Sequence, residues 1–134
     1  MSFNFNGYKI AKISYINENS ASDGLKNIHF EIKKVLVSGT TDKKNATILI
    51  NSESTVSDKE KGEIYRKLDL ETIFYFNLHG NEDTAEKELT NTGINICISI
   101  VRDIIRKITS IDYSGPIDVK PIDLPVKLKI ENSN

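Results

Sequence analysis

Few residues in this chain could carry chemistry, and their spacing does not assemble a catalytic or metal site. The two histidines, His29 and His79, lie far apart, one early in an expected strand and the other just after one. The single Cys97 excludes an intramolecular disulfide and a cysteine-based zinc site, and no base lies near it in sequence to lower its pKa. Acidic residues gather at 82–88, where they suit a helix N-terminus better than acid–base catalysis. We therefore expect no enzymatic activity, no metal and no cofactor.

Length and charge define the broad class. The chain has 134 residues, enough for one domain, and a net charge of -1. Nucleic-acid binders usually concentrate positive charge, so this balance argues against a nucleic-acid partner. No apolar run has the length of a signal peptide or of a membrane-spanning helix. The expectation is a single cytoplasmic domain over residues 1–134 that does not insert into membranes.

Alternating apolar and polar residues predict four strands, at about 2–16, 28–38, 46–56 and 63–78. The strand at 63–78 gives the clearest pattern. Most of its apolar residues occupy even positions, and polar residues occupy most of its odd positions. Such alternation is typical of an antiparallel sheet with one face on the core. The phase slips at Asn6-Gly7 and at Lys33-Lys34, as at a bulge. Short polar turns link the last three strands, which predicts a meander.

The segment 94–111 begins with strand-like alternation but, taken whole, has apolar residues every three or four positions, as in a helix. We favour one helix at about 84–111, capped by Asp83 and kinked near Thr92-Gly93. Its apolar side chains would cover roughly 200° of the helix, which is wider than packing on one sheet requires. Self-association is the simplest explanation, with an interface expected at Ile96, Ile100, Ile104 and Ile108.

Two further apolar surfaces are expected. The tail at 113–130 spaces three prolines among apolar residues, which forbids a helix and favours an extended strip. On the odd face of the strand at 63–78, the side chains of Tyr65, Ile73 and Tyr75 form an exposed set that suggests a contact surface. Apolar strips without accompanying chemistry point to binding rather than catalysis.

Short motifs in the helix and the tail match those of a known family. Asn95-Ile96 and Arg102-Asp103 correspond to an Asn-Ile pair and a later Arg-acidic pair in its helix. Gly115-Pro116 and the run KPIDL at 120–124 are similar to its Phe-Pro and Ala-Pro-Val-Asn-Phe segments. The run IFYFNL at 73–78 is similar to its Ile-Phe-Ser-Ile strand end. Over most of its length, the sequence thus resembles the SecB-type protein-export chaperones.

The resemblance implies four antiparallel strands followed by a long helix, with sheets joined edge to edge and helices packed between dimers. It also implies an ATP-independent holdase, dimeric or tetrameric, that keeps unfolded or extended polypeptides competent for export. The implied polypeptide-binding residues are Leu25, Ile28, Phe30, Pro116, Ile117, Val119, Ile122 and Leu124. The sheet surface that could face a partner, in the family the export motor ATPase SecA, carries Glu63, Tyr65, Asp69, Glu71, Ile73 and Tyr75.

Departures from the family pattern weigh against docking to the motor. The sequence has no full second C-terminal helix after Leu128 and no acidic tail, and its charge is nearly neutral where export chaperones are acidic. Two alternatives therefore stay open. One is a dedicated SecB-like chaperone of a single partner, such as an antitoxin. The other, from a different class, is an α+β roll that encloses a small ligand in a deep cavity with convergent polar groups.

Overall fold

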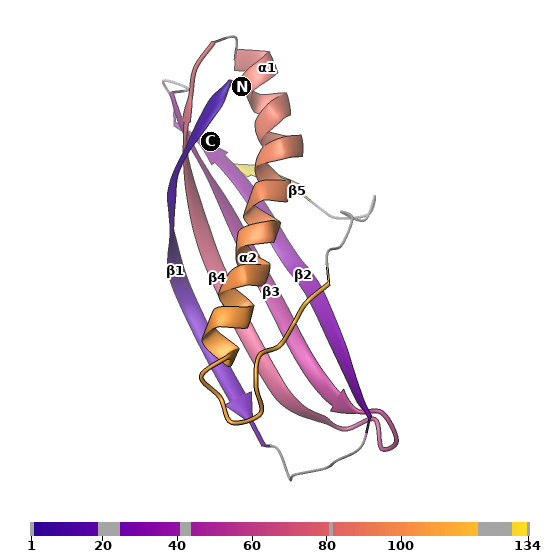
Figure 1. Cartoon of the computed structure of the whole chain (residues 1–134). Coiled ribbons are helices and arrows are strands. Elements are labelled where there is room, and N and C mark those ends of the chain that lie inside the picture. Colours follow the sequence, from indigo (N-terminus) through magenta and orange to yellow (C-terminus); the bar gives the residue numbers. More distant parts are fainter. Residues whose placement is uncertain (1, 19–24, 41–43, 81, 121–129, 134) are drawn as a thin grey trace.

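The computed structural model describes residues 2–18, 25–40, 44–80, 82–120 and 130–133. This part of the chain forms four long strands, a helix with one π-helical turn, and a short further strand (Figure 1). The first four strands lie close to the ranges that alternation predicts. The elements are β1 (Phe3–Asn17), β2 (Lys26–Gly39), β3 (Asn45–Asp58), β4 (Ile64–Leu78), α1 (Glu82–Glu88), η1 (Leu89–Gly93), α2 (Ile94–Thr109) and β5 (Ile130–Ser133).

The strands form one sheet in the order β1-β4-β3-β2-β5. β2, β3 and β4 form the predicted antiparallel meander, and β1 pairs antiparallel with the far side of β4. β5, which the sequence did not predict, pairs parallel with β2 from Val35 to Ser38. Its four residues are too few and too polar to show alternation, so only its pairing with β2 identifies it as a strand.

Register shifts occur where the alternation slips. The β1–β4 register shifts between Phe5 and Gly7, and the β2–β3 register shifts between Ile32 and Lys34. Gly7 has a φ of 124°, which residues with a side chain rarely adopt, so glycine suits this bulge. A further shift between Ile10 and Lys12 keeps Ile13 and Tyr15 on the same face of the sheet as Ile10. Both bulges expected from the sequence are confirmed.

α2 lies across one face of the sheet, so the ambiguous segment is a helix (Figure 1). Its buried side chains share the core with even-numbered residues of β3 and β4, among them the fully buried Ile48, Ile50 and Phe74. This packing buries the apolar side chains of α2 that face the sheet. The buried residues of α2 are Ile94, Cys97, Ile98, Val101, Ile104, Ile105 and Thr109.

The helix changes geometry at the expected kink. Between α1 and α2, Leu89–Gly93 forms a π-helical turn. A Cβ added at the buried Gly93 would lie 3.0 Å from Cδ1 of Leu89, so the glycine lets this leucine pack against the backbone. At the other end, α1 begins at Glu82, one residue before the predicted cap Asp83.

Candidate functional site

After α2 the chain turns back along the sheet and lies between α2 and β2 (Figure 1). Gly115 has a φ of 81°, which suits the reversal. We call residues 115–120 the tail segment. Its buried side chains are Ile117 and Val119, and the side chains before, between and after them are exposed. The tail segment therefore has the alternation of a strand, although it pairs with no strand in the part of the chain described.

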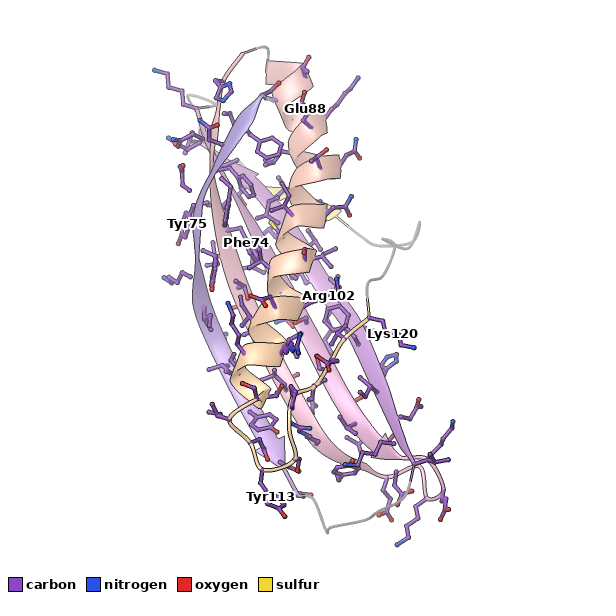
Figure 2. The ribbon with its side chains drawn as sticks, viewed as in Figure 1. Phe74, Tyr75, Glu88, Arg102, Tyr113 and Lys120 are labelled. Atoms are coloured by element: carbon purple, nitrogen blue, oxygen red, sulfur yellow. The ribbon has the colours of Figure 1, made fainter. Side chains whose placement is uncertain are left out.

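Three side chains hold the backbone of the tail segment. Arg66 donates from its guanidinium to the carbonyl of the turn glycine. The N–H of Ile117 donates to the hydroxyl of Thr109 at 2.8 Å. Nε of Arg102 donates to the carbonyl of Val119 at 2.9 Å, and Figure 2 shows Arg102 on the flank of α2 that faces the tail segment. These bonds satisfy backbone groups that would otherwise lack a strand partner.

A groove of about 390 Å³ lies between the tail segment and the first half of β2. Ile28, which is 46% exposed, and the half-buried Phe30 supply apolar surface from β2, and Val119 lines the groove from the tail segment. Figure 2 shows Lys120 beside β2. The groove opens to solvent, so it suits an extended chain better than an enclosed ligand. Its described lining residues are Lys26, Asn27, Ile28, Phe30, Asp118, Val119 and Lys120.

The edge of β2 beside the groove is open among the described residues. β5 pairs with β2 only from Val35 to Ser38, and no described strand pairs with the outer edge over residues 26–33. An open edge presents backbone N–H and C=O groups to which an added strand can hydrogen-bond. The groove thus combines apolar side chains with main-chain hydrogen-bonding groups, the combination that an extended peptide requires.

A buried arginine joins β1, β4 and the turn after α2. Arg66 is 4% exposed, and its Nε donates to the hydroxyl of Tyr15 at 2.6 Å. That hydroxyl donates to Oδ2 of Asp112 at 2.5 Å, and Nδ2 of Asn17 donates to the same carboxylate at 3.1 Å. The backbone N–H of Ser114 donates to Oδ1 of Asp112 at 2.9 Å. We call Tyr15, Asn17, Arg66 and Asp112 the clasp.

The clasp fixes the turn from which the tail segment starts, so it positions one wall of the groove. Donation from the Tyr15 hydroxyl is the largest of several effects that lower the pKa of Asp112 to about 2. The pKa of Tyr15 is raised, chiefly because burial disfavours the phenolate and also because Asp112 accepts its proton in a hydrogen bond. Sequence reasoning missed the clasp, and its one signal was Arg66 at an even, core-facing position of β4.

Only some of the predicted polypeptide-binding residues line the groove. Ile28, Phe30 and Val119 come together in the groove. Leu25 is 72% exposed immediately before β2, where its carbonyl accepts a hydrogen bond from the N–H of Lys59 at 2.9 Å. Pro116 is exposed on the tail segment but does not line the groove. The groove therefore gathers three of these residues, from two elements far apart in sequence.

Two predicted surface residues lie in the core. Ile117 is fully buried, because the alternation of the tail segment turns it inward, so it offers no surface to a polypeptide. Ile104 is 4% exposed and faces the sheet, so it offers none to a second subunit. Both expectations are corrected on this point. The predicted binding residues Ile122 and Leu124 lie outside the described residues.

Apolar side chains remain exposed on the β1 side of α2. Arg102 marks the flank of α2 that faces the tail segment and β2, and Ile96 and Ile100 lie on the opposite flank, six and two residues earlier in the helix. Ile96, Ile100 and Ile108 are half-buried. We call Ile96 and Ile100 the β1 flank. Facing it on the same side of the sheet is the β1 strip, four side chains each 38–49% exposed: Phe5, Tyr8, Ile10 and Ile13.

The opposite face of the sheet is not covered by the helix. Figure 2 shows Tyr75 directed away from the side on which Phe74 meets the helix. Tyr75 is 38% exposed, Tyr65 and Ile73 are half-buried, and Glu63 is exposed just before β4. The predicted partner-facing residues thus lie on or beside one open sheet face.

Two carboxylates of this open face, those of Glu53 and Asp69, lie beside lysines. Glu53 pairs with Lys33 and, at 3.7 Å, with Lys67, and the Lys33 ammonium lowers the pKa of Glu53. Lys67 also lies 3.9 Å from Asp69. Glu71 accepts a hydrogen bond from an asparagine of β3 at 3.5 Å. The face is therefore mixed in charge rather than acidic.

In the described part of the chain, no helix is long and apolar enough to cross a membrane. Within the same residues, no group of three or more His, Cys, Asp or Glu side chains could hold a metal ion. Cys97 is fully buried, and burial raises the pKa of its thiol far above its usual range, which makes it a packed apolar residue rather than a nucleophile.

Comparison with known proteins identifies the architecture. No protein-family model matches the chain, and no curated protein matches it in sequence. The Mycobacterium tuberculosis Rv1957 SecB-like chaperone, solved in complex with a ChAD peptide from the Rv1956 HigA1 antitoxin, is similar with a TM-score of 0.67 and 12% identity, over 93% of this chain and 94% of that one. A Streptococcus agalactiae protein of unknown function has a TM-score of 0.45 and 9% identity, over 88% and 96% of the two chains. The first comparison, with four antiparallel strands followed by a helix in this chain, shows that the protein has a SecB-like fold.

Proposed function

We propose that this protein is an ATP-independent chaperone of the holdase type, which binds non-native or extended polypeptides in the cytoplasm and is not an enzyme. The observation that carries the proposal is the groove beside the open edge of β2. Ile28 and Phe30, together with the small exposed part of the mostly buried Val119, would bury apolar side chains of a client, and the edge would hydrogen-bond its backbone. Neither interaction selects a particular sequence, so the clients share an extended apolar character.

The affinity for one client segment should be moderate. Burying one apolar side chain contributes about 1.5–3 kcal/mol, and the groove offers apolar contacts for only a few. Ordering an extended peptide offsets much of that gain. We therefore expect dissociation constants of roughly micromolar order, which correspond to about 8 kcal/mol. Such binding allows release without nucleotide hydrolysis.

We also propose that the β1 strip and the β1 flank form a self-association surface, which makes the protein a dimer or tetramer. The outer edge of β1 pairs with no strand in the part of the chain described. A long edge strand with exposed apolar side chains is a template for pairing with another copy. Light scattering coupled to size exclusion tests this, and a monomer at about 10 µM protein, well above a micromolar dissociation constant, would contradict it.

The chaperone proposal is tested by binding and by protection from aggregation. A fluorescent extended apolar peptide should bind the wild type, and the wild type should suppress aggregation of a chemically unfolded client. Phe30→Ser removes apolar surface from the groove and should weaken both activities. Tyr75→Ser, on the opposite sheet face, is the matched control and should weaken neither. Equal effects of the two variants, or no activity in the wild type, would refute the assignment.

A dedicated client is the second candidate, with an antitoxin as the kind of partner. The SecB-like chaperone with the similar fold was solved with an antitoxin peptide. In addition, the lysine-matched carboxylates of the open sheet face weaken the case for docking to SecA through an acidic surface. Titration with purified SecA distinguishes the two roles, because binding of at least micromolar affinity supports export and its absence supports a dedicated client.

A further inference from the structure

The groove has an excess of positive charge at its rim. What we infer from this charge rests on the proposed chaperone function. Among the described lining residues the ionisable side chains are Lys26, Asp118 and Lys120. Asp118 pairs with Arg106, whose Nε lies 3.2 Å from Oδ1 of the carboxylate. Within the described residues neither lysine forms an ion pair, although Nζ of Lys26 lies 6.0 Å from the ring centroid of Tyr65. The carboxylate of the groove is thus neutralised and the lysines are not.

A second, smaller groove on the other side of the tail segment is lined by two arginines and two aspartates. It has a volume of about 180 Å³, shares Asp118 and Val119 with the first groove, and is also lined by Ser99, Arg102, Asp103 and Arg106 of α2. Asp103 pairs with Lys107 at 2.8 Å. Both carboxylates of the two grooves are therefore already paired, whereas the Arg102 guanidinium donates from Nε only to a neutral carbonyl.

This cationic region contrasts with the chain as a whole. Eighteen lysines and arginines against nineteen acidic residues give the protein a net charge of -1. Around the tail segment, the described side chains include cations from β2, α2 and the tail segment itself, and the two carboxylates among them are bound to cations. A local field of one sign in a protein of the opposite net sign favours ligands by their charge.

We propose that the groove selects extended apolar client segments that carry carboxylate side chains beside their apolar residues. The apolar residues of such a segment lie against Ile28, Phe30 and Val119, and its carboxylates meet the ammonium groups of Lys26 and Lys120. The long stems of both lysines can lie along the apolar wall while their charged ends reach a flanking aspartate or glutamate. Segments flanked by lysine or arginine are repelled by the same groups.

The test compares three fluorescent peptides with the same apolar core, flanked at both ends by aspartate, by serine or by lysine. At an ionic strength of about 0.01 M, where screening is weak, the aspartate peptide should bind up to about fivefold more tightly per ion pair than the serine peptide. The lysine peptide should bind more weakly than the serine peptide. At about 1 M salt the three affinities should converge, because screening acts within about 3 Å.

Charge-removing variants assign the preference to the groove. Lys120→Gln and Lys26→Gln should each reduce the ratio of aspartate-peptide to serine-peptide affinity. Lys87→Gln, an exposed lysine of α1 outside the groove, should leave the ratio unchanged. Equal or tighter binding of the lysine peptide, or an unchanged ratio in both groove variants, would overturn the inference. If none of the three peptides binds, the proposed chaperone function itself fails and the inference fails with it.

Discussion

Replacing Asp112 by asparagine tests the clasp that positions the tail segment. The carboxylate accepts hydrogen bonds from the hydroxyl of Tyr15 at 2.5 Å, from Nδ2 of Asn17 at 3.1 Å and from the N–H of Ser114 at 2.9 Å. An asparagine at this position would keep the shape of the side chain but lose its charge, and a neutral acceptor makes weaker hydrogen bonds. We therefore expect Asp112→Asn to fold and to be less stable.

The lowered pKa of Asp112 sets the size and the pH range of the effect. The folded-state pKa of about 2 lies below the ordinary value of 3.8, and the full difference would correspond to about 2.4 kcal/mol. Because the carboxyl is partly exposed, solvent screening reduces this to about 1 kcal/mol. A depressed folded-state pKa stabilises the protein above pH 3.8, and the contribution is lost as the pH falls from 3.8 towards 2.

Urea unfolding followed by circular dichroism measures the prediction, at one fixed protein concentration because self-association would change the apparent stability. Wild type and Asp112→Asn should differ by about 1 kcal/mol at pH 7, and the gap should shrink steadily below about pH 4. Asp118→Asn, which removes an exposed carboxylate paired with Arg106, is the matched control and should change stability by at most about 0.5 kcal/mol. A gap that is constant from pH 7 to the acid limit would refute the role assigned to the charge.

Three further predictions concern the interior. Ile104→Asp should abolish cooperative unfolding, because burying a carboxylate costs several kcal/mol, whereas Ile96→Asp should stay folded and shift light-scattering mass towards the monomer. The thiol of Cys97 should react with a disulfide reagent only at the rate of unfolding, and fast reaction in the native protein would contradict its burial. Arg66→Lys should lower the free energy of unfolding by about 1–3 kcal/mol, which a lower urea midpoint would report. An ammonium group cannot reproduce the donor geometry that reaches both the Tyr15 hydroxyl of β1 and the carbonyl of Gly115.

The fold was largely predictable because its elements have strong periodic patterns. The even positions of β4 predicted the face that meets the helix, and the phase slips at Gly7 and Lys33-Lys34 predicted bulges. The helix was ambiguous only over a short window, since β-branched residues suit both structures locally and the longer repeat decides between them. β5 was not predictable, because four residues carry no usable period and their pairing with β2 is tertiary.

The site was only partly predictable, because it depends on which way short segments turn. The proline spacing correctly excluded a helix over the described residues 115–120, but it could not tell which of two alternating faces of the tail segment would be buried. The structure shows Ile117 and Val119 facing inward, with Val119 also lining the groove and Ile117 fully buried. Similarly, the width of the apolar arc on α2 indicated a partner without showing that Ile104 faces the sheet.

Two neighbours, the sheet and the tail segment, cover most of the broad apolar arc of α2, and their placement shows how the two proposed surfaces can coexist. The sheet covers its centre, and the tail segment, held by Arg102, covers the side towards β2. The β1 flank, Ile96 and Ile100, packs against the edge of the core and stays half-buried. The client groove lies on the β2 side and the proposed self-association surface on the β1 side, with β3 and β4 between their edge strands. Three strand spacings of about 4.8 Å separate the two edges, so a client in the groove need not contact a second copy bound at β1. The two proposed surfaces, one for assembly and one for client binding, therefore use different residues of one helix–sheet unit, and occupation of one does not require the other to be vacated.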